Sequence, residues 1–175
     1  MSMRTRLRRG LTAAGLLIGL SGCGYHLRGD IPGTKQEKTL MMTGVSKSNP
    51  LYVAFTQDLT SRGGTLATKS TSASAIINVI RAYHIRRPIT LSSAGRANMF
   101  DLTFRVVYEV QSPKGEILVP EKELMVRREY FNTQSSPLGQ GYEEVQMRSE
   151  MEKEASQTLL RQVVFTLRDK NTHPS

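Results

Sequence analysis

The feature that most constrains the fold is the alternation of side-chain character along residues 102–110. Apolar residues occupy every second position there: Leu102, Phe104, Val106, Tyr108 and Val110. Between them stand Thr103, Arg105 and Glu109. Because successive side chains of a strand point to opposite faces, this pattern predicts a strand with one buried face. Such a strand needs neighbouring strands and a second layer to cover its apolar side.

Neighbouring strands are predicted on both sides of this segment. Residues 75–85 are rich in β-branched side chains, which favour strands. Pro88 is expected to end or bulge that strand because proline cannot donate to the ladder. Residues 92–95 and 112–115 have the composition of turns, and residues 116–131 run back as a long strand interrupted at Pro120. The three strands are expected to form an antiparallel meander.

A first helix is predicted directly after Asn49. Asn49 is a favourable N-cap, and Pro50 suits the first helical position. Apolar residues then follow at helical spacing: Leu51, Phe55 and Leu59. Gly63 supplies a stop signal.

A second helix is predicted over residues 142–168, after a polar loop at 132–141. Four residues form its inner row: Met151, Ala155, Leu159 and Val163. Glu144 and Arg148 have the spacing of an ion pair one turn apart. The acidic residues of this segment are expected to decorate a solvated face rather than to form a catalytic carboxylate pair: Glu143, Glu144, Glu150, Glu152 and Glu154.

Short strands at 38–45 and 65–69 complete the order β-α-β-β-β-β-α. This order predicts an α+β fold, a two-layer sandwich in which two helices cover one face of a largely antiparallel sheet of about four to five strands. Residues 38–168 are expected to form a single domain, followed by a polar tail at 169–175. The length of 175 residues suits one domain.

Residues 1–22 have the pattern of a secretory signal peptide that is removed. Four arginines lie before the apolar run at residues 11–20, which ends in small residues. Ten helical residues rise only about 15 Å, roughly half of a bilayer core. A permanent transmembrane span is therefore a poor alternative.

The segment Leu20-Ser21-Gly22-Cys23 resembles the lipobox of bacterial lipoproteins, which implies that Cys23 becomes the acylated first residue of the mature chain. Cys23 is the only cysteine, which excludes an intramolecular disulfide. Its diacylglycerol and N-acyl chain would anchor the protein stably, and no other cofactor is expected. Residues 23–37 read as a lipidated tether. Because residue 24 is Gly and not the Asp that retains many lipoproteins in the inner membrane, we expect an outer-membrane location.

Removal of the signal peptide lowers the formal net charge from +9 to +5, because it takes away four arginines and no acid. An exported chain with few aromatic residues and no recognition motif is not expected to bind nucleic acid. A basic surface outside the cytoplasm more plausibly meets anionic lipid or phosphorylated glycolipid.

The sequence contains no recognisable catalytic or metal motif. His26, His84 and His173 are scattered, and His84 is expected to be a partly exposed strand residue rather than a catalytic base. No nucleophile stands in an obvious pairing with a base. We therefore expect neither an enzyme nor a metal site.

Arginines around the predicted meander are candidates for a patch at one end of the sheet that contacts a phosphorylated lipid head group, because guanidinium forks match phosphate oxygens. The candidates are Arg86, Arg87, Arg96, Arg127 and Arg128. The alternative is that they are ordinary solubilising or cross-strand-paired side chains.

The residues around Cys23 resemble the mature start of the lipopolysaccharide-assembly lipoprotein family LptE. The motif is carried by Gly24, Tyr25, His26, Leu27 and Arg28. The resemblance implies a two-layer α/β fold and lipidation at Cys23. It also implies a plug inside the large β-barrel protein LptD, which the family helps to assemble and with which it delivers lipopolysaccharide to the outer leaflet. The domain would then face the periplasm and the barrel lumen.

Two other classes stay open at this point. One is a generic outer-membrane lipoprotein that binds anionic glycolipid, glycan or protein partners. The other is a small secreted hydrolase, which the missing nucleophile and base disfavour.

Overall fold

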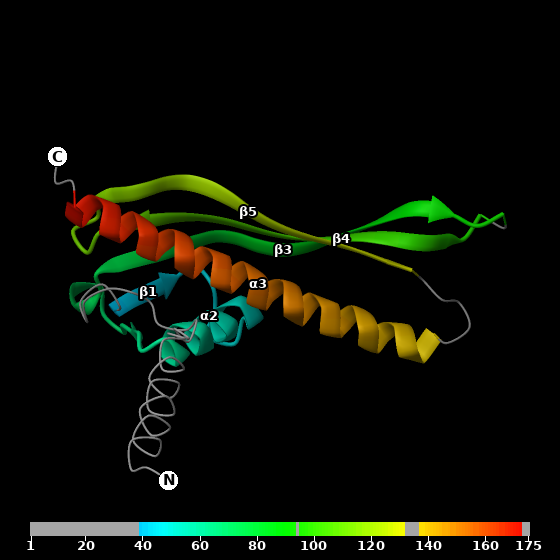
Figure 1. Ribbon diagram of the computed structural model, residues 1–175, viewed down its shortest axis with the longest axis horizontal. Coiled ribbons are helices and arrows are strands. Elements are labelled where there is room, and N and C mark those ends of the chain that lie inside the picture. Colours follow the sequence, from blue (N-terminus) through cyan, green and yellow to red (C-terminus); the bar gives the residue numbers. More distant parts are fainter. Residues whose placement is uncertain (1–38, 94, 132–136, 173–175) are drawn as a thin grey trace, which may run out of the picture. The chain divides into compact units, whose positions relative to one another are not determined.

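The computed structural model describes residues 39–93, 95–131 and 137–172, all within one compact unit. This part of the chain forms a five-stranded mixed sheet and two α-helices, an α+β fold (Figure 1). The strand order is β2-β1-β3-β4-β5. The predicted signal peptide, the tether at 23–37 and the loop residues 132–136 lie outside the described residues.

The predicted antiparallel meander is confirmed. It consists of β3 (Ala75–Leu91), β4 (Ala97–Gln111) and β5 (Ile117–Phe131). β3 continues beyond Pro88, with a shift in register between Pro88 and Thr90, so the proline bulges the strand without ending it. The turn before β5 uses Gly115 at a φ of 87°, a conformation that favours glycine.

The other edge of the sheet is parallel. β1 (Thr39–Thr43) pairs in parallel with both β2 (Thr65–Leu66) and β3. The chain leaves β1 through Gly44, where an added Cβ would lie 2.0 Å from the carbonyl oxygen of Val79. The crossover from β1 to β2 is made by α2, as parallel neighbours require.

The first helix, α2 (Pro50–Ser61), has the predicted boundaries. The Asn49 side chain accepts a hydrogen bond of 2.9 Å from the backbone N–H of Leu51, and Pro50 opens the helix. Between β2 and β3 lies the short 3₁₀ turn η1 (Ser70–Ser72).

The second helix, α3 (Pro137–Thr172), is longer than predicted at both ends. Residues 137–141, predicted to belong to a polar loop, are helical, and Pro137 fits the first helical turn, where its missing N–H has no intrahelical acceptor. At the other end, residues 169–172 are helical instead of belonging to a polar tail.

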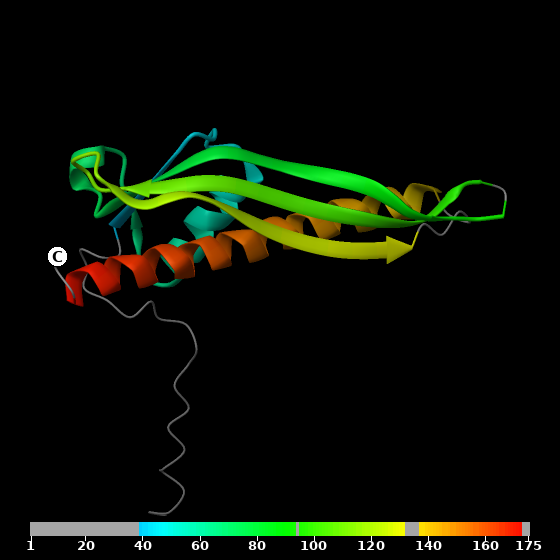
Figure 2. The same ribbon diagram turned by 90° about the horizontal axis from the view of Figure 1, so that it is seen from above.

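The helices and the sheet form two layers around one core (Figure 2). Leu40 of β1, Phe55 of α2 and Ile77 of β3 are fully buried in it. From α3, Leu159 is fully buried against the same cluster. Tyr108 of β4 is almost fully buried, and this burial raises the pKa of its phenol.

Neither of the described helices combines the length and the apolar character that a membrane crossing requires.

Candidate functional site: a polar seam between sheet and helix

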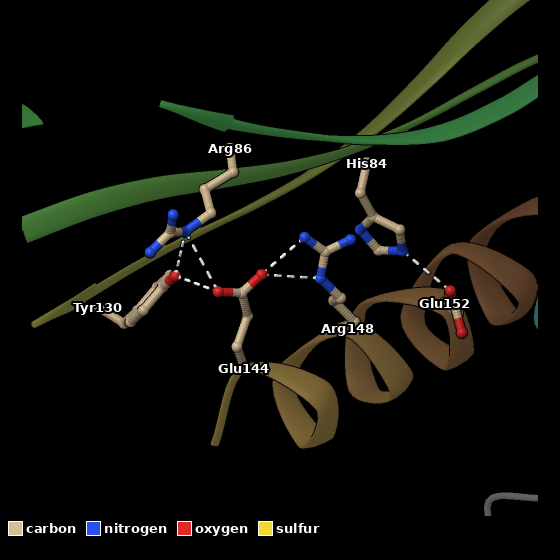
Figure 3. Close-up of polar contacts among 6 residues, drawn as sticks. All are labelled: His84, Arg86, Tyr130, Glu144, Arg148 and Glu152. Atoms are coloured by element: carbon tan, nitrogen blue, oxygen red, sulfur yellow. Dashed lines mark hydrogen bonds and ion pairs between the residues drawn. The ribbon is translucent and has the colours of Figure 1, made fainter. Parts of the chain in front are cut away.

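The most organised polar cluster of the described residues lies between α3 and the far part of β3–β5 (Figure 3). We call it the polar seam, and it consists of His84, Arg86, Tyr130, Glu144, Arg148 and Glu152. The strand residues share one face because positions two apart on a strand point the same way. The helix residues are spaced by four, which places them on one side of α3.

Glu144 is the centre of the seam. One of its carboxylate oxygens accepts hydrogen bonds from the Arg148 Nε and Nη2 atoms at 3.0 and 2.6 Å. The other accepts from the Tyr130 hydroxyl and lies 3.2 Å from the Arg86 Nε. Arg86 Nε also donates to the Tyr130 hydroxyl at 2.7 Å. A single carboxylate therefore joins β3, β5 and α3.

These contacts change the ionisation of two groups in opposite directions. Partial burial acts to raise the pKa of Glu144, but hydrogen bonds from Tyr130 and Arg148 and the charges of Arg148 and Arg86 outweigh it, so the pKa is lowered. The pKa of Tyr130 is raised, first by burial and then by its hydrogen bond to Glu144. At neutral pH the seam thus holds an ionised carboxylate and a neutral phenol.

Aromatic rings of β4 form the floor of the seam. The Arg86 guanidinium lies 3.5 Å from the centroid of the Phe100 ring, and the Tyr130 ring stacks on Phe100 at 5.6 Å. His84 stacks on Phe104 with centroids 4.4 Å apart. Planar groups with polar atoms therefore lie against the apolar rings of β4 here.

His84 also connects the sheet to α3. Its Nε2 atom lies 2.9 Å from a Glu152 carboxylate oxygen, and both side chains are largely buried. The prediction that His84 is a partly exposed strand residue is confirmed: it lies on β3, and the exposure of the whole residue, backbone included, is intermediate. No group of three potential metal ligands occurs among the described residues. We interpret the polar seam as a device that orients α3 on the sheet.

The prediction of a solvated face is wrong for two of the acidic residues. Glu144 and Glu152 point toward the sheet, with side chains 21% and 15% exposed. Both residues lie four positions from Arg148, on the same side of the helix. This spacing was the sequence signal that the three side chains act together. The predicted ion pair between Glu144 and Arg148 is confirmed.

The five candidate arginines do not form one patch. Arg86 and Arg128 lie on the helix-facing side, where Arg128 pairs with Glu154. Arg87 and Arg127 follow them in sequence and therefore point to the open face of the sheet. Arg96 lies at the hairpin between β3 and β4, where its backbone N–H donates to the Ser92 hydroxyl. Lipopolysaccharide contact stays a prediction for all five residues. The lipidation site Cys23 and the motif Gly24–Arg28 lie outside the described residues.

A family model matches most of the domain just described. The model is LptE, with the description lipopolysaccharide-assembly, and it covers residues 38–163. This chain belongs to the LptE family. The family match begins next to β1 and extends through most of α3, so it includes both layers of the fold.

Curated relatives agree with this assignment. The LPS-assembly lipoprotein LptE of Photorhabdus laumondii is 25% identical over 154 residues, which cover 85% of this chain and 84% of the relative. The LPS-assembly lipoprotein LptE of Pectobacterium atrosepticum is 25% identical over 163 residues, with 93% and 87% covered. The chain is therefore a member of a lipopolysaccharide-assembly family of membrane-associated lipoproteins.

A solved structure shows the same fold. The solution NMR structure of lipoprotein B from Nitrosomonas europaea superposes with a TM-score of 0.68. It covers 86% of this chain and 97% of the other chain at 24% identity.

Proposed function

We propose that this chain is an outer-membrane lipoprotein that fills the lumen of an LptD β-barrel, assists the assembly of that barrel and takes part in delivering lipopolysaccharide to the outer leaflet. The observation that carries the proposal is the LptE family match over residues 38–163. The diacylglycerol and N-acyl chain on Cys23 would hold the domain at the membrane, facing the periplasm and the lumen. In this role the protein acts by binding and not by catalysis.

The open face of the meander, which points away from the helices, supports this role. Two arginines of this face are paired across strands: Arg105 with Glu123 at 3.3 Å, and Arg127 with Asp101 at 3.0 Å. A barrel lumen is polar and wet, so a surface of solvated, internally paired charges suits it better than an apolar one.

The proposal is tested by purifying the tagged, full-length lipoprotein from detergent-solubilised outer membrane and identifying the proteins that accompany it. We expect one large β-barrel protein in a 1:1 ratio. A well-extracted membrane that yields no such barrel would contradict the plug role. A set of glycans or soluble proteins in its place would favour a generic lipoprotein binding module.

The anchor is tested separately with Cys23→Ser, which removes the thiol that receives the lipid. We expect incorporation of labelled palmitate in the parent chain and none in the variant. Ser21→Ala, which keeps a small residue before Cys23, is the matched control and should retain the label. Equal labelling of Cys23→Ser would exclude Cys23 as the acylation site.

A further inference from the structure

A groove lies between α2 and α3, two helices that contact each other beside the sheet (Figure 1). It runs along a side of α2 that differs from the side buried in the core. Its volume is about 610 Å³, which is within the range of ligand pockets. The lining combines Pro50, Val53 and Ala54 of α2 with the carboxylates of Asp58 of α2 and Glu152 of α3.

The two carboxylates of the groove still have hydrogen-bonding capacity. The side chain of Asp58 is only 11% exposed, and its Oδ1 atom accepts a hydrogen bond of 2.9 Å from Arg62 Nε. Its Oδ2 atom is buried without a hydrogen-bond partner among the described residues. Glu152 uses one oxygen for His84, and its other oxygen has no hydrogen bond to a described residue. A buried carboxylate oxygen without a donor is costly, so a cation that enters the groove would stabilise it. A rotation about the last side-chain bond of Asp58, which is a soft torsion, turns Oδ2 toward such a cation.

The first described strand begins near the Ser61 end of this groove. Thr39 of β1 pairs with Thr65 of β2, which follows Ser61, the last residue of α2, by four positions. Four residues span at most about 13 Å and neighbouring strands lie about 5 Å apart, so Thr39 lies within about 18 Å of Ser61. Arg28 precedes Thr39 by eleven positions, which reach about 36 Å when extended. The segment before β1 is therefore long enough to return along the groove.

The segment at 24–38 also complements the groove in charge. It carries three cations against two acids, a formal charge of +1, whereas the groove lining has two carboxylates against Lys153, a formal charge of −1. Arg28 is the only arginine of the segment, and a guanidinium fork matches a carboxylate with two parallel hydrogen bonds. Leu27 beside it supplies an apolar group for Val53 at the wall of the groove.

We propose that residues 24–31 dock into the groove between α2 and α3, with the guanidinium of Arg28 on the carboxylate of Asp58. The docking gives a role to the motif at 24–28, which the proposed function leaves without one. A consequence for the membrane rests on the proposed acylation of Cys23. Sixteen positions separate Cys23 from Thr39 and allow about 53 Å, whereas five separate it from Arg28 and allow about 17 Å. Docking thus holds the domain close to the membrane, with α2 and the groove facing it.

The chain contains no tryptophan, so a single introduced tryptophan reports on the docked segment alone. The test uses the full-length lipoprotein with Tyr25→Trp in a nonionic detergent. Its fluorescence should lie at shorter wavelength, and acrylamide should quench it less, than in a synthetic peptide of residues 24–31 with the same tryptophan. Arg28→Gln and Asp58→Asn each remove one partner, and each should weaken the docking equilibrium by about tenfold. The tryptophan then becomes as accessible as in the peptide.

Two control variants separate docking from charge and from the structure of α2. Lys35→Gln removes an equal charge from the same segment, and the docking equilibrium should stay within about twofold. Arg62→Gln breaks the pair with Asp58 inside α2 and keeps the carboxylate, so docking should be retained. The far-ultraviolet circular dichroism of each variant reports whether it is folded.

The position of Arg28 is tested with Arg28→Lys, which keeps the charge and supplies a primary amine. A water-soluble carbodiimide couples an amine to a carboxylate in direct contact, and mass spectrometry of the digested protein locates the new amide bond. We expect position 28 to be joined to Asp58. Crosslinks from position 28 only to acids outside the groove, or none, would overturn the proposal.

Two fluorescence results would overturn the proposal as well. One is a tryptophan as accessible in the parent lipoprotein as in the peptide. The other is a tryptophan that stays protected in a folded Asp58→Asn variant, which would place the ring in the detergent and not in the groove. Copurification of a barrel and labelling of Cys23 are separate measurements, so a failure of docking is distinguishable from a failure of the proposed function.

Discussion

The two halves of α3 contact the sheet through different chemistry. From Met151 onward, the helix contributes an apolar stripe to the core: Met151, Ala155, Leu159, Leu160, Val163, Val164 and Leu167. Between Gly141 and Glu150 none of its residues is fully buried, and only Met147 of this half packs against the edge of the core. The other contacts of this half to the sheet are the hydrogen bonds and ion pairs of the polar seam. Burial of apolar side chains contributes a large free energy of folding but depends little on orientation. Ion pairs and hydrogen bonds depend strongly on orientation and contribute a modest net free energy. We infer that the apolar half stabilises the domain. The polar half fixes the orientation of the N-terminal part of α3 on the sheet.

The largest expected effect is in the apolar half. Leu159→Ala removes a fully buried side chain from the core and should lower the free energy of unfolding by about 2–5 kcal/mol, since it leaves a cavity. Urea denaturation followed by circular dichroism measures this change. Phe165→Ala on the same helix is the matched control, because Phe165 is 73% exposed, and it should change stability by less than about 0.5 kcal/mol. Equal effects of the two substitutions would refute the distinction between buried and exposed faces of α3.

The central carboxylate of the polar seam should have a smaller effect. Glu144→Gln keeps the shape of the side chain and removes the charge that faces Arg86 and Arg148, so we expect a loss of about 1–2 kcal/mol in the same urea measurement. Glu143→Gln removes an equal charge from the neighbouring, exposed position and should be close to neutral. A neutral Glu144→Gln variant would show that the seam does not stabilise the packing of α3.

Acid should remove the contribution of Glu144. Because the pKa of Glu144 in the folded chain is lowered from 4.5, its stabilising effect is present at neutral pH and is lost as the pH falls through the folded pKa. The difference in unfolding free energy between the parent chain and Glu144→Gln should therefore stay constant from pH 7 down to the ordinary pKa of 4.5 and shrink as the pH falls below it. A difference that stays constant or grows below this pKa would contradict the lowered pKa.

The smallest effect is expected at the ion pair between Arg128 and Glu154. Both side chains are 45% exposed, so water screens the pair. Arg128→Gln should change the unfolding free energy by less than about 0.5 kcal/mol in urea. A loss of unfolding free energy as large as that of Glu144→Gln would show that this pair stabilises the packing of α3 as the polar seam does.

The same comparison explains what could be predicted from the sequence. The alternation at 102–110 and the inner row of α3 report burial directly, and both predictions are confirmed in β4 and in the apolar half. The polar half carries no hydrophobic periodicity, so its acidic residues resembled a solvated face. Because adjacent residues of a strand point to opposite faces, the sequence already indicated that Arg86 and Arg87 lie on different faces of the sheet. Their shared charge nevertheless suggested one patch. The parallel pairing of β1 depends on contacts distant in sequence, which no local pattern encodes.

Hydrogen exchange along α3 under native conditions tests the central claim most directly, because each backbone amide reports the free energy at which its own segment opens. We predict that amides at 144–150 exchange at a lower opening free energy than those at 155–167. Glu144→Gln should lower the opening free energy of the amides at 144–150 only, and Glu143→Gln should change the opening free energy of neither segment. A single opening free energy along the whole helix, unchanged by Glu144→Gln, would contradict the division of α3 into an apolar and a polar half.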